Sequence, residues 1–389
     1  MATARAWLGI QYATANRFAW PQLVPWEGDL ARTGTLGPAA PQPAADGIVP
    51  GMDAGPTDEA ACLSLNVWAP ETADAGSRPV LVWFHGGSFV VGSSAQRCHD
   101  GARIASEQGV VLVTVNYRLG ALGFLDTRAI GGDVANLGLH DALAALHWVQ
   151  DNIAAFGGDP DRVTVFGLSA GGGIAVHLLA SAASRGLLHR VIVQSGITDR
   201  TLDAERGALV AKSLCEACAV DDLAGLERLP ADTIVSAQTA VLPQLLKPVG
   251  MMPFHPCIDD DLLDAAPAAA FRAGRGADVP LIAGSTSEEM NLFLGFAPAV
   301  ARDRLVGRVA RYVGVDEVAA TAVVERYEAE VAPDGVWPAL FTDFEMQVPL
   351  RRVLEARASA TAPTYAYLFT WTSPAHGAFH AVDLPFTFD

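Results

Sequence analysis

The chain has 389 residues, 51% of them hydrophobic, and a formal net charge of −17 at pH 7, so it can bury a large core. The acidity argues against partners such as nucleic acids and anionic membranes, because both present negative charge that needs a cationic protein surface. No stretch reaches the roughly eighteen uncharged apolar residues of a membrane span, and α/β folds of this length often form one domain.

The five cysteines are scattered, and the first residues lack the apolar core of a signal peptide. Cys215 and Cys218 have the spacing of a redox or metal pair, but no second Cys or His pair accompanies them, as a zinc site requires. We interpret them as two thiols on one helical face and expect no metal. Scattered thiols in odd number fit a reducing, cytoplasmic location.

Strands and helices are predicted to alternate along the chain after a long loop at residues 27–61, which is rich in Pro, Gly, Ala and Asp. Uninterrupted apolar runs predict strands at 79–84, 110–115, 163–166, 190–194, 280–283 and 364–370. Helical patterns occupy 141–156, 201–278 and 300–360. Buried strands separated by helices predict an α/β fold with a mostly parallel central sheet flanked by helices, in which helical insertions wall a pocket.

The most informative segment is Gly167-Leu168-Ser169-Ala170-Gly171, which follows the strand at 163–166 and opens onto a run of small residues. A strand, a Gly-x-Ser-x-Gly turn and a helix form the context in which a serine becomes a nucleophile. Taken alone, the pentapeptide could equally be a glycine-rich turn that happens to contain serine.

An activated serine also needs a base, a carboxylate that orients the base, and donors for the oxyanion. His85-Gly86-Gly87-Ser88 follows the strand at 79–84, and its glycines let backbone N–H groups face a bound oxyanion. Glu289 follows the strand at 280–283, and His380, with His376 as a competitor, follows the last strand. Each signal is weak alone, but the order Ser, Glu, His is the order that a nucleophile-elbow enzyme produces.

With these residues in place, the chain resembles the type-B carboxylesterases, a branch of the α/β-hydrolases that includes bacterial esterases and cholinesterases. The resemblance runs nearly end to end. It rests on Leu8-Gly9-Ile10-Gln11-Tyr12-Ala13, Cys62-Leu63-Ser64-Leu65-Asn66-Val67, Asn116-Tyr117-Arg118-Leu119-Gly120, Asn136-Leu137-Gly138-Leu139-His140-Asp141, and 152–160 running into the elbow.

The resemblance implies a Ser169, Glu289 and His380 triad. It further implies an oxyanion hole made by the backbone N–H groups of Gly87, Ser88 and Ala170.

The chain departs from the family pattern at several of these positions. Leu168 stands where the family usually has glutamate, Ser88 replaces a glycine and Met290 replaces the glycine after the acid. Cys62 has no upstream cysteine, so the disulfide of secreted members cannot form within this chain. Leu168 and Phe89 are candidate pocket-lining residues, although both residue types are also common in cores. A less acidic pocket favours neutral esters over cationic substrates.

The chain is expected to form one α/β-hydrolase domain over residues 1–389, without the N-terminal strands and C-terminal helices that usual members carry. Apolar surface is therefore expected to be exposed where such helices would pack, with self-association as a consequence.

The favoured function is hydrolysis of carboxylic esters with short or medium acyl or aryl groups, through an acyl-enzyme, with water and a small-molecule ester as partners and no cofactor. Two alternatives stay open: hydrolysis of amides or carbamates by the same triad, and a non-catalytic binding protein of the same fold.

Overall fold

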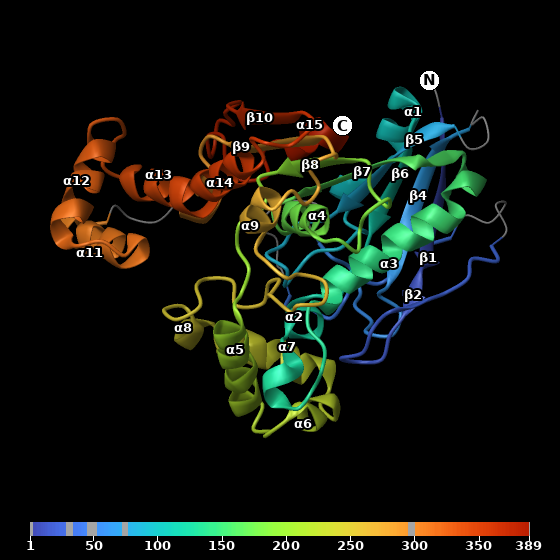
Figure 1. Cartoon of the computed structure of the whole chain (residues 1–389), viewed down its shortest axis with the longest axis horizontal. Helices are drawn as coiled ribbons and strands as arrows, with labels where there is room; N and C mark the ends of the chain where they lie inside the picture. Colours follow the sequence, from blue (N-terminus) through green and yellow to red (C-terminus); the bar gives the residue numbers. More distant parts are fainter. Residues whose placement is uncertain (1–2, 29–33, 45–52, 72–76, 295–299, 389) are drawn as a thin grey trace.

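The computed structural model describes residues 3–28, 34–44, 53–71, 77–294 and 300–388. Their centre is an eight-stranded sheet of order β1-β4-β6-β5-β7-β8-β9-β10 (Figure 1). The strands are β1 (Ala4–Gln11), β4 (Ser64–Pro70), β5 (Arg78–Phe84), β6 (Val111–Val115), β7 (Gly158–Leu168), β8 (Arg190–Gln194), β9 (Leu281–Thr286) and β10 (Thr364–Phe369). The six from β6 to β10 are mutually parallel, which confirms the predicted mostly parallel sheet.

The sequence missed two strands of the central sheet, β1 and β4, and a small hairpin. β4 pairs antiparallel with both β1 and β6, and thereby extends the sheet toward the amino-terminal segment. A separate small hairpin joins β2 (Ala13–Thr14) to β3 (Gln22–Leu23). The loop predicted at 27–61 contains no regular element in its described parts, while 29–33 and 45–52 lie outside the described residues.

The two faces of the sheet carry separate cores, because successive side chains of a strand point to opposite faces. Val82, Val113 and Val165 face α3 (Leu137–Asn152) and α4 (Ala170–Ala180), which lie in front of the strands in Figure 1. On the other face, Trp83, Leu112 and Phe166 pack with side chains of α1 (Ala102–Gln108) and α15 (Leu384–Phe388). The continuous apolar runs of the sequence thus reflect burial on both sides.

Long helical insertions follow β8 and β9, as the sequence predicts. After β8 come α5 (Ala204–Ala217), α6 (Leu223–Glu227), α7 (Ala231–Ala240), α8 (Leu242–Leu245) and α9 (Pro267–Arg272). After β9 come α10 (Asn291–Leu294), α11 (Arg302–Val313), α12 (Glu317–Glu328), α13 (Val336–Thr342) and α14 (Val348–Ala356). Shorter helical segments are α2 (Gly120–Phe124) and the 3-10 turns Arg97–His99, Thr127–Ile130 and Ile153–Phe156. Cys215 lies on α5 and Cys218 caps that helix, and both thiols are free.

A buried ion pair holds the end of β6 against the start of α3. Two guanidinium nitrogens of Arg118 donate to the two carboxylate oxygens of Asp141 at 2.7 and 2.8 Å, and both side chains are almost fully buried. A third Arg118 nitrogen donates to the carbonyl of Ala19 at 2.7 Å. Because a buried charge is tolerated only when it is paired and hydrogen-bonded, this arrangement fixes three segments of chain relative to one another.

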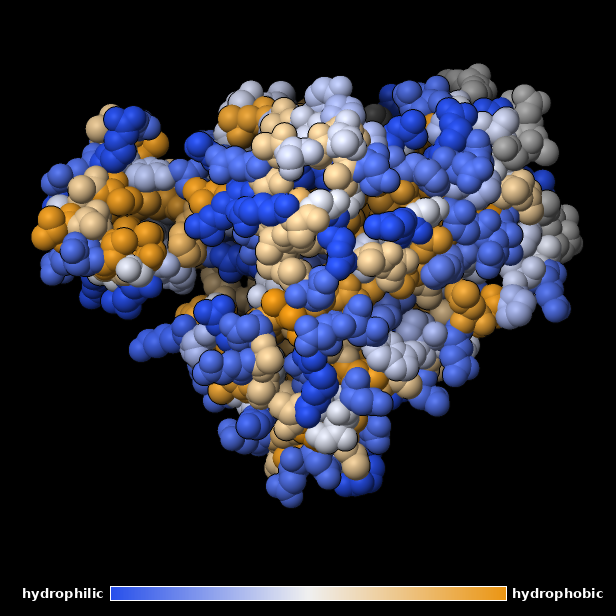
Figure 2. Space-filling model, in the orientation of Figure 1, coloured by the Kyte–Doolittle hydropathy of each residue, from blue (hydrophilic) through white to orange (hydrophobic). Residues whose placement is uncertain are grey.

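Helices α11, α12 and α13 form a lobe, residues 302–342, at one end of the molecule (Figure 1). The lobe has its own hydrophobic core, which includes Leu305, Val324, Trp337 and Phe341. Hydrophobic residues also reach its surface, as the orange atoms at the left of Figure 2 show. The lobe connects to the sheet through the continuous helical stretch from α13 to α14.

The sheet face that carries Phe166 becomes progressively exposed toward the β10 edge. Across one row of paired residues, Phe166 is 4% exposed, Ile192 is half-buried, Ile282 is 40% exposed and Tyr365 is 59% exposed. Further large apolar side chains are exposed on β10 and after it: Leu368, Trp371 and Phe386. Among the described helices, none is long and apolar enough to cross a membrane.

This exposed row predicts self-association. We expect the protein to bind a hydrophobic dye and to show a concentration-dependent mass, because exposed apolar patches promote association. Tyr365→Lys should reduce both effects, whereas Val318→Lys, at an 81% exposed site on α12, should not. Dye fluorescence and sedimentation velocity measure the difference. A monodisperse monomer that binds no dye would contradict the expectation.

Four buried histidines predict a loss of stability in acid. Burial lowers the pKa of His85 and His177 to about 4 and that of His99 and His255 to about 3. The unfolded chain, with ordinary histidine pKa values near 6.5, then binds more protons than the folded chain. The contribution of these histidines to the free energy of unfolding is therefore complete above about pH 6.5 and is lost as the pH falls toward 4.

Each of these histidines adds a slope of up to about 1.4 kcal/mol per pH unit to the free energy of unfolding in that window. Denaturant unfolding between pH 7 and 4.5 measures the slope. Replacing buried His177 by Gln should reduce the slope by the contribution of one histidine, whereas Ser213→Ala, which removes a buried hydroxyl and no histidine, should leave it unchanged. Equal slopes in the two variants would refute the assignment.

Candidate functional site

Ser169 occupies a strained turn between β7 and α4. Its backbone has φ 57° and ψ −119°, a conformation that residues with a side chain rarely adopt and that is typical of functional sites. The turn is fixed by its backbone: the Ser169 N–H donates to the Gln194 carbonyl at 2.9 Å, and the Ser169 carbonyl accepts from the N–H groups of Gly173 and Ile197. The structure therefore has the strand, turn and helix context expected of a nucleophile elbow.

The elbow is packed against the end of β5. A Cβ on Gly171 would lie 1.9 Å from the carbonyl oxygen of Phe84, so no side chain fits there. A Cβ on Gly86 would lie 3.2 Å from Cβ of Ser169. The glycines of the two motifs thus let the loop after β5 contact the elbow directly.

Three consecutive residues after Gly86 have positive φ: Gly87 at 117°, Ser88 at 55° and Phe89 at 63°. The Gly87 carbonyl accepts from the N–H groups of Val90 and Val91, both at 3.0 Å, which closes the loop. Within the described part of the chain, the N–H groups of Gly87, Ser88 and Ala170 donate to no other protein group. All three predicted oxyanion donors are therefore available.

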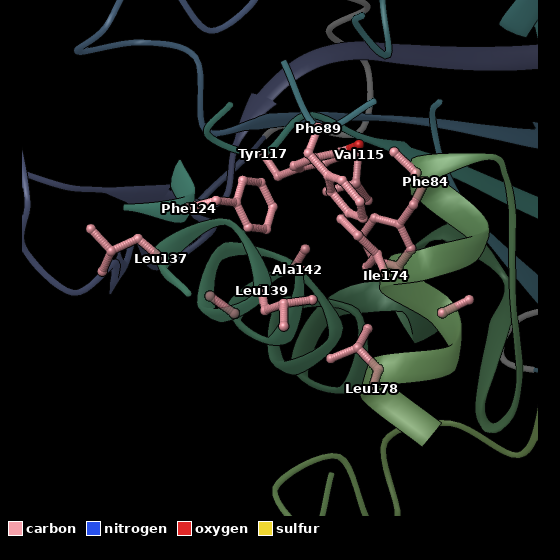
Figure 3. Close-up of a cluster of buried hydrophobic side chains, with 14 of the residues drawn as sticks. Phe84, Phe89, Val115, Tyr117, Phe124, Leu137, Leu139, Ala142, Ile174 and Leu178 are labelled. Carbon is pink, nitrogen blue, oxygen red and sulfur yellow. The ribbon is translucent and has the colours of Figure 1, made fainter. Parts of the chain in front are cut away.

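Leu168 and Phe89, the two candidate pocket-lining residues, are both buried. Phe89 is fully buried in the main core, where its ring packs edge-on against Phe124 at 5.0 Å (Figure 3). Leu168 is buried in the other core, with Leu384 and Phe388. Their residue types allowed either role, and the direction of each side chain is set by backbone geometry that the sequence does not reveal.

His85 packs against the loop after β5 that carries Gly87 and Ser88 (the oxyanion loop), and the sequence analysis assigned this histidine no role of its own. Its ring stacks on Tyr117 at 4.5 Å, its Nδ1 lies 2.8 Å from the Gly86 carbonyl, and its own carbonyl accepts from the Tyr117 hydroxyl at 2.8 Å. Burial lowers the pKa of His85 to about 4, so the ring is neutral near pH 7. A neutral Nδ1–H can then donate to the Gly86 carbonyl.

The predicted acid and base are in direct contact. Nδ1 of His380 lies 2.5 Å from Oε2 of Glu289, and the His380 N–H donates to the Glu289 carbonyl at 3.2 Å. The other carboxylate oxygen, Oε1, accepts from the Thr286 N–H at 2.8 Å. Glu289 is fully buried and His380 is 6% exposed. This pairing holds the Nδ1 side of the imidazole and leaves Nε2 for a second partner.

The neighbouring competitors have other partners. Glu288 accepts from the Ala378 N–H at 2.6 Å and so holds the loop that carries His380, rather than the imidazole itself. The ring of His376 packs edge-on against Phe379 at 5.6 Å. Of the two glutamates and two histidines that the sequence offered, Glu289 and His380 form the pair.

Gln194 connects the segment that carries His380 and Asp383 to the turn at Ser169. Its carbonyl accepts from Ser169, while its side-chain nitrogen donates to Asp383 at 3.2 Å and to the Thr387 hydroxyl at 2.8 Å. Burial and the nearby charge of Glu289 raise the pKa of Asp383. Neither Gln194 nor Asp383 was predicted, although Asp383 lies only three residues after His380.

The Ser169 hydroxyl makes no hydrogen bond with any residue that the structure describes, and the side chain is 8% exposed. Contacts of a nucleophile with its base are often long before substrate binds and shorten in the complex. The ring of Phe293, which is 54% exposed, lies 5.5 Å from that of His380 and so marks the solvent side of the imidazole.

A cavity lies beside the loop that carries His380. It has a volume of about 780 Å³ and is lined mainly by apolar side chains, among them Trp371, Phe379 and Phe386. Ser169 is not part of its lining. Across the described ranges, no group of His, Cys, Asp and Glu side chains is arranged to hold a metal ion.

Comparison with known proteins gives consistent similarities. The model of the family described as "Carboxylesterase family" matches residues 1–389. The chain is 33% identical to a para-nitrobenzyl esterase of Bacillus subtilis (strain 168), over 98% of this chain and 78% of that protein, and 35% identical to a phenmedipham hydrolase of Pseudarthrobacter oxydans, over 93% and 73%.

Solved structures are similar as well. A thermophilic PNB esterase superposes with a TM-score of 0.87 at 32% identity, covering 99% of this chain and 80% of the other. A carboxylesterase of Geobacillus stearothermophilus has a TM-score of 0.85 at 33% identity, with 99% and 80% coverage. The chain therefore spans about four fifths of the length of these proteins.

The close approach at Gly171 predicts a large effect of one methyl group. Gly171→Ala should lower the free energy of unfolding by about 3 kcal/mol or more, because the added Cβ displaces backbone rather than a side-chain tip. Gly307→Ala is the matched control on helix α11, where the nearest atom would lie 3.7 Å away. That variant should gain up to about 1 kcal/mol from its better helix propensity. Chemical denaturation of both variants measures the contrast, and equal stabilities would show that the crossing can relax.

Proposed function

The chain belongs to the carboxylesterase family, and from this we propose that it hydrolyses carboxylic esters through a triad of Ser169, His380 and Glu289. The observation that carries the proposal is the 2.5 Å contact between His380 Nδ1 and the fully buried Glu289 carboxylate, in a molecule that also places Ser169 on a strained elbow. A neutral imidazole that donates from Nδ1 presents its Nε2 lone pair to a serine hydroxyl.

In the acylation step, His380 takes the proton of Ser169 as the hydroxyl oxygen attacks the acyl carbon. Glu289 keeps the imidazole in the required tautomer and stabilises the imidazolium that forms. His380 then gives its proton to the departing alcohol, which leaves an acyl-enzyme on Ser169. Water, activated by the same imidazole, attacks the acyl carbon and releases the acid.

The negative oxygen of each tetrahedral intermediate would bind the N–H groups of Gly87, Ser88 and Ala170. Support comes from their lack of protein acceptors among the described residues and from the direct packing of Gly86 on Ser169. A donor of this kind contributes on the order of 3 kcal/mol to stabilisation of the transition state. The positive φ angles of Gly87 and Ser88 aim these groups before substrate arrives, so little reorganisation is needed.

Neutral esters are the favoured substrates. Leu168 places no carboxylate next to the nucleophile, and Phe293 offers an aromatic surface beside His380, which suits aryl or short acyl groups. Residues 51–58, which precede Cys62, include no aromatic side chain that could bind a cationic substrate. Of these residues, the structure describes 53–58.

A second candidate is cleavage of an amide or carbamate by the same residues. It is favoured by the name of one relative, a probable N-octanoylanthranilate hydrolase of Rhodococcus erythropolis, since an N-octanoyl linkage to an aromatic amine is an amide. Rates on p-nitrophenyl butyrate and on the matching butyryl p-nitroanilide separate the two. An ester-to-anilide ratio near one would favour the second candidate.

The nucleophile assignment predicts that Ser169→Ala abolishes hydrolysis of p-nitrophenyl butyrate and covalent labelling by a fluorophosphonate probe. The reason is that only an activated serine oxygen attacks either reagent. Ser213→Ala is a matched control, because Ser213 on α5 is as buried as Ser169, at 8% exposure. Labelling and hydrolysis should persist in the control, and circular dichroism should show that both variants fold. Retained labelling in Ser169→Ala would refute the proposal.

A further inference from the structure

The helical stretch that joins the lobe to the sheet is interrupted by a π-helical turn. The turn, Asp343–Gln347, lies between α13 and α14 and follows Thr342 without a break. Single π-turns within α-helices are rare and are found frequently at functional sites. Here the turn passes directly beside the loop that carries Glu289.

Two side chains of this stretch bind the chain on either side of the acid. The Thr342 hydroxyl accepts from the Met290 N–H at 3.1 Å, and the Gln347 side-chain nitrogen donates to the Thr286 carbonyl at 3.3 Å. Met290 directly follows Glu289, and the Thr286 N–H holds Oε1 of Glu289. The two contacts therefore fix both ends of the short loop from which the carboxylate projects.

The π-turn explains how both contacts are possible at once. Thr342 and Gln347 are five residues apart, and in an α-helix with 3.6 residues per turn they would point about 140° away from each other. The i to i+5 repeat of a π-turn brings residues at that spacing onto nearly the same side. A regular helix through this region could make one of the two contacts but not both.

The same turn also reaches the chain behind the nucleophile. Glu345 is 5% exposed and binds Arg200, with 2.7 Å between its Oε2 and the Arg200 Nη2. Arg200 belongs to the segment after β8, in which the Ile197 N–H donates to the Ser169 carbonyl at 3.2 Å. A buried carboxylate that is paired in this way resists displacement of the turn, because separation would leave an unpaired buried charge.

We propose that the π-helical turn positions the catalytic carboxylate, with Thr342 and Gln347 as positioning residues for Glu289 and the Glu345–Arg200 ion pair as the anchor of the turn. The inference rests on the proposed function, because it assigns a task to the triad. With the Thr342 and Gln347 contacts in place, Oε2 of Glu289 lies 2.5 Å from Nδ1 of His380. When either contact is lost, the carboxylate stabilises the imidazolium less, which lowers the turnover rate.

The test is Thr342→Val, which keeps the shape of the side chain and removes the acceptor of the Met290 N–H. We expect kcat on p-nitrophenyl butyrate to fall about tenfold, the effect of one lost buried hydrogen bond. KM should stay within about twofold, and the acid limb of the kcat/KM profile should move to lower pH. Thr342→Ser restores the hydroxyl and should restore both values.

Thr321→Val is the matched control. Thr321 lies on α12, is partly exposed, and donates its hydroxyl to the Glu317 carbonyl of its own helix at 2.7 Å. It should leave kcat and the pH profile unchanged. If Thr342→Val fails to fold, Gln347→Met, at a half-buried site, removes the second contact, that with the Thr286 carbonyl. It should likewise lower kcat and move the acid limb to lower pH.

The outcomes separate this inference from the proposed function. An unchanged kcat and acid limb in folded Thr342→Val or Gln347→Met, in an enzyme whose Ser169 is labelled by fluorophosphonate, would overturn the positioning role alone. A wild-type protein that is not labelled would overturn both proposals. A lower melting temperature with wild-type kinetics would show that the turn serves stability only.

Discussion

The structure depends first on the close crossing of β7 into α4 at Ser169. The serine accepts a strained backbone, and Gly171 lets the start of α4 lie against the carbonyl of Phe84, where no Cβ could fit. Because α4 then runs buried along the sheet, its packing maintains the strain that the isolated turn could not sustain. The position of Ser169 thus depends on steric exclusion together with the backbone hydrogen bonds of the turn.

The proposed site residues all follow parallel strands, whose carboxyl ends lie at the same edge of the sheet. The proposed oxyanion loop follows β5, Ser169 follows β7, Glu289 follows β9 and His380 follows β10. β8 supplies the remaining link, since Gln194 binds the backbone of Ser169 on one side and Asp383 on the other. A parallel sheet therefore brings four segments that are far apart in the sequence to one edge.

The sequence indicated where the parallel strands end, but it did not indicate in which direction individual side chains point. Apolar runs located the six parallel strands, and the glycine motifs located the elbow and the oxyanion loop. β1 and β4 were missed, since β4 carries Asn66 and β1 carries Arg5, which interrupt the apolar pattern on which the prediction relied. Leu168 and Phe89 pack into the cores because backbone angles, not residue types, direct their side chains.

Contacts between distant polar residues were also outside the reach of the sequence. Arg118 and Asp141 occur in two recognised motifs, yet nothing in either segment indicates that they pair. The π-turn at Asp343–Gln347 contains no glycine or proline that would mark it, and the contacts of Thr342 and Gln347 with Met290 and Thr286 join residues that are far apart in the sequence. Such interactions depend on how finished elements meet, which a local pattern does not encode.

The two halves of the site are held by different forces, and this difference shapes how each responds to change. Ser169 and the oxyanion loop are fixed by close packing, in which an added methyl group has no place to go. Glu289 and His380 are fixed by a chain of hydrogen bonds that runs through Thr286, Met290 and the π-turn into the lobe, where Met290 and Met346 share the core. Packing of this density permits essentially one arrangement, whereas a hydrogen-bonded loop can shift by fractions of an ångström and keep its partners. Glu289 and His380 are therefore the part of the proposed site that a movement of the lobe can shift, whereas packing keeps Ser169 in place.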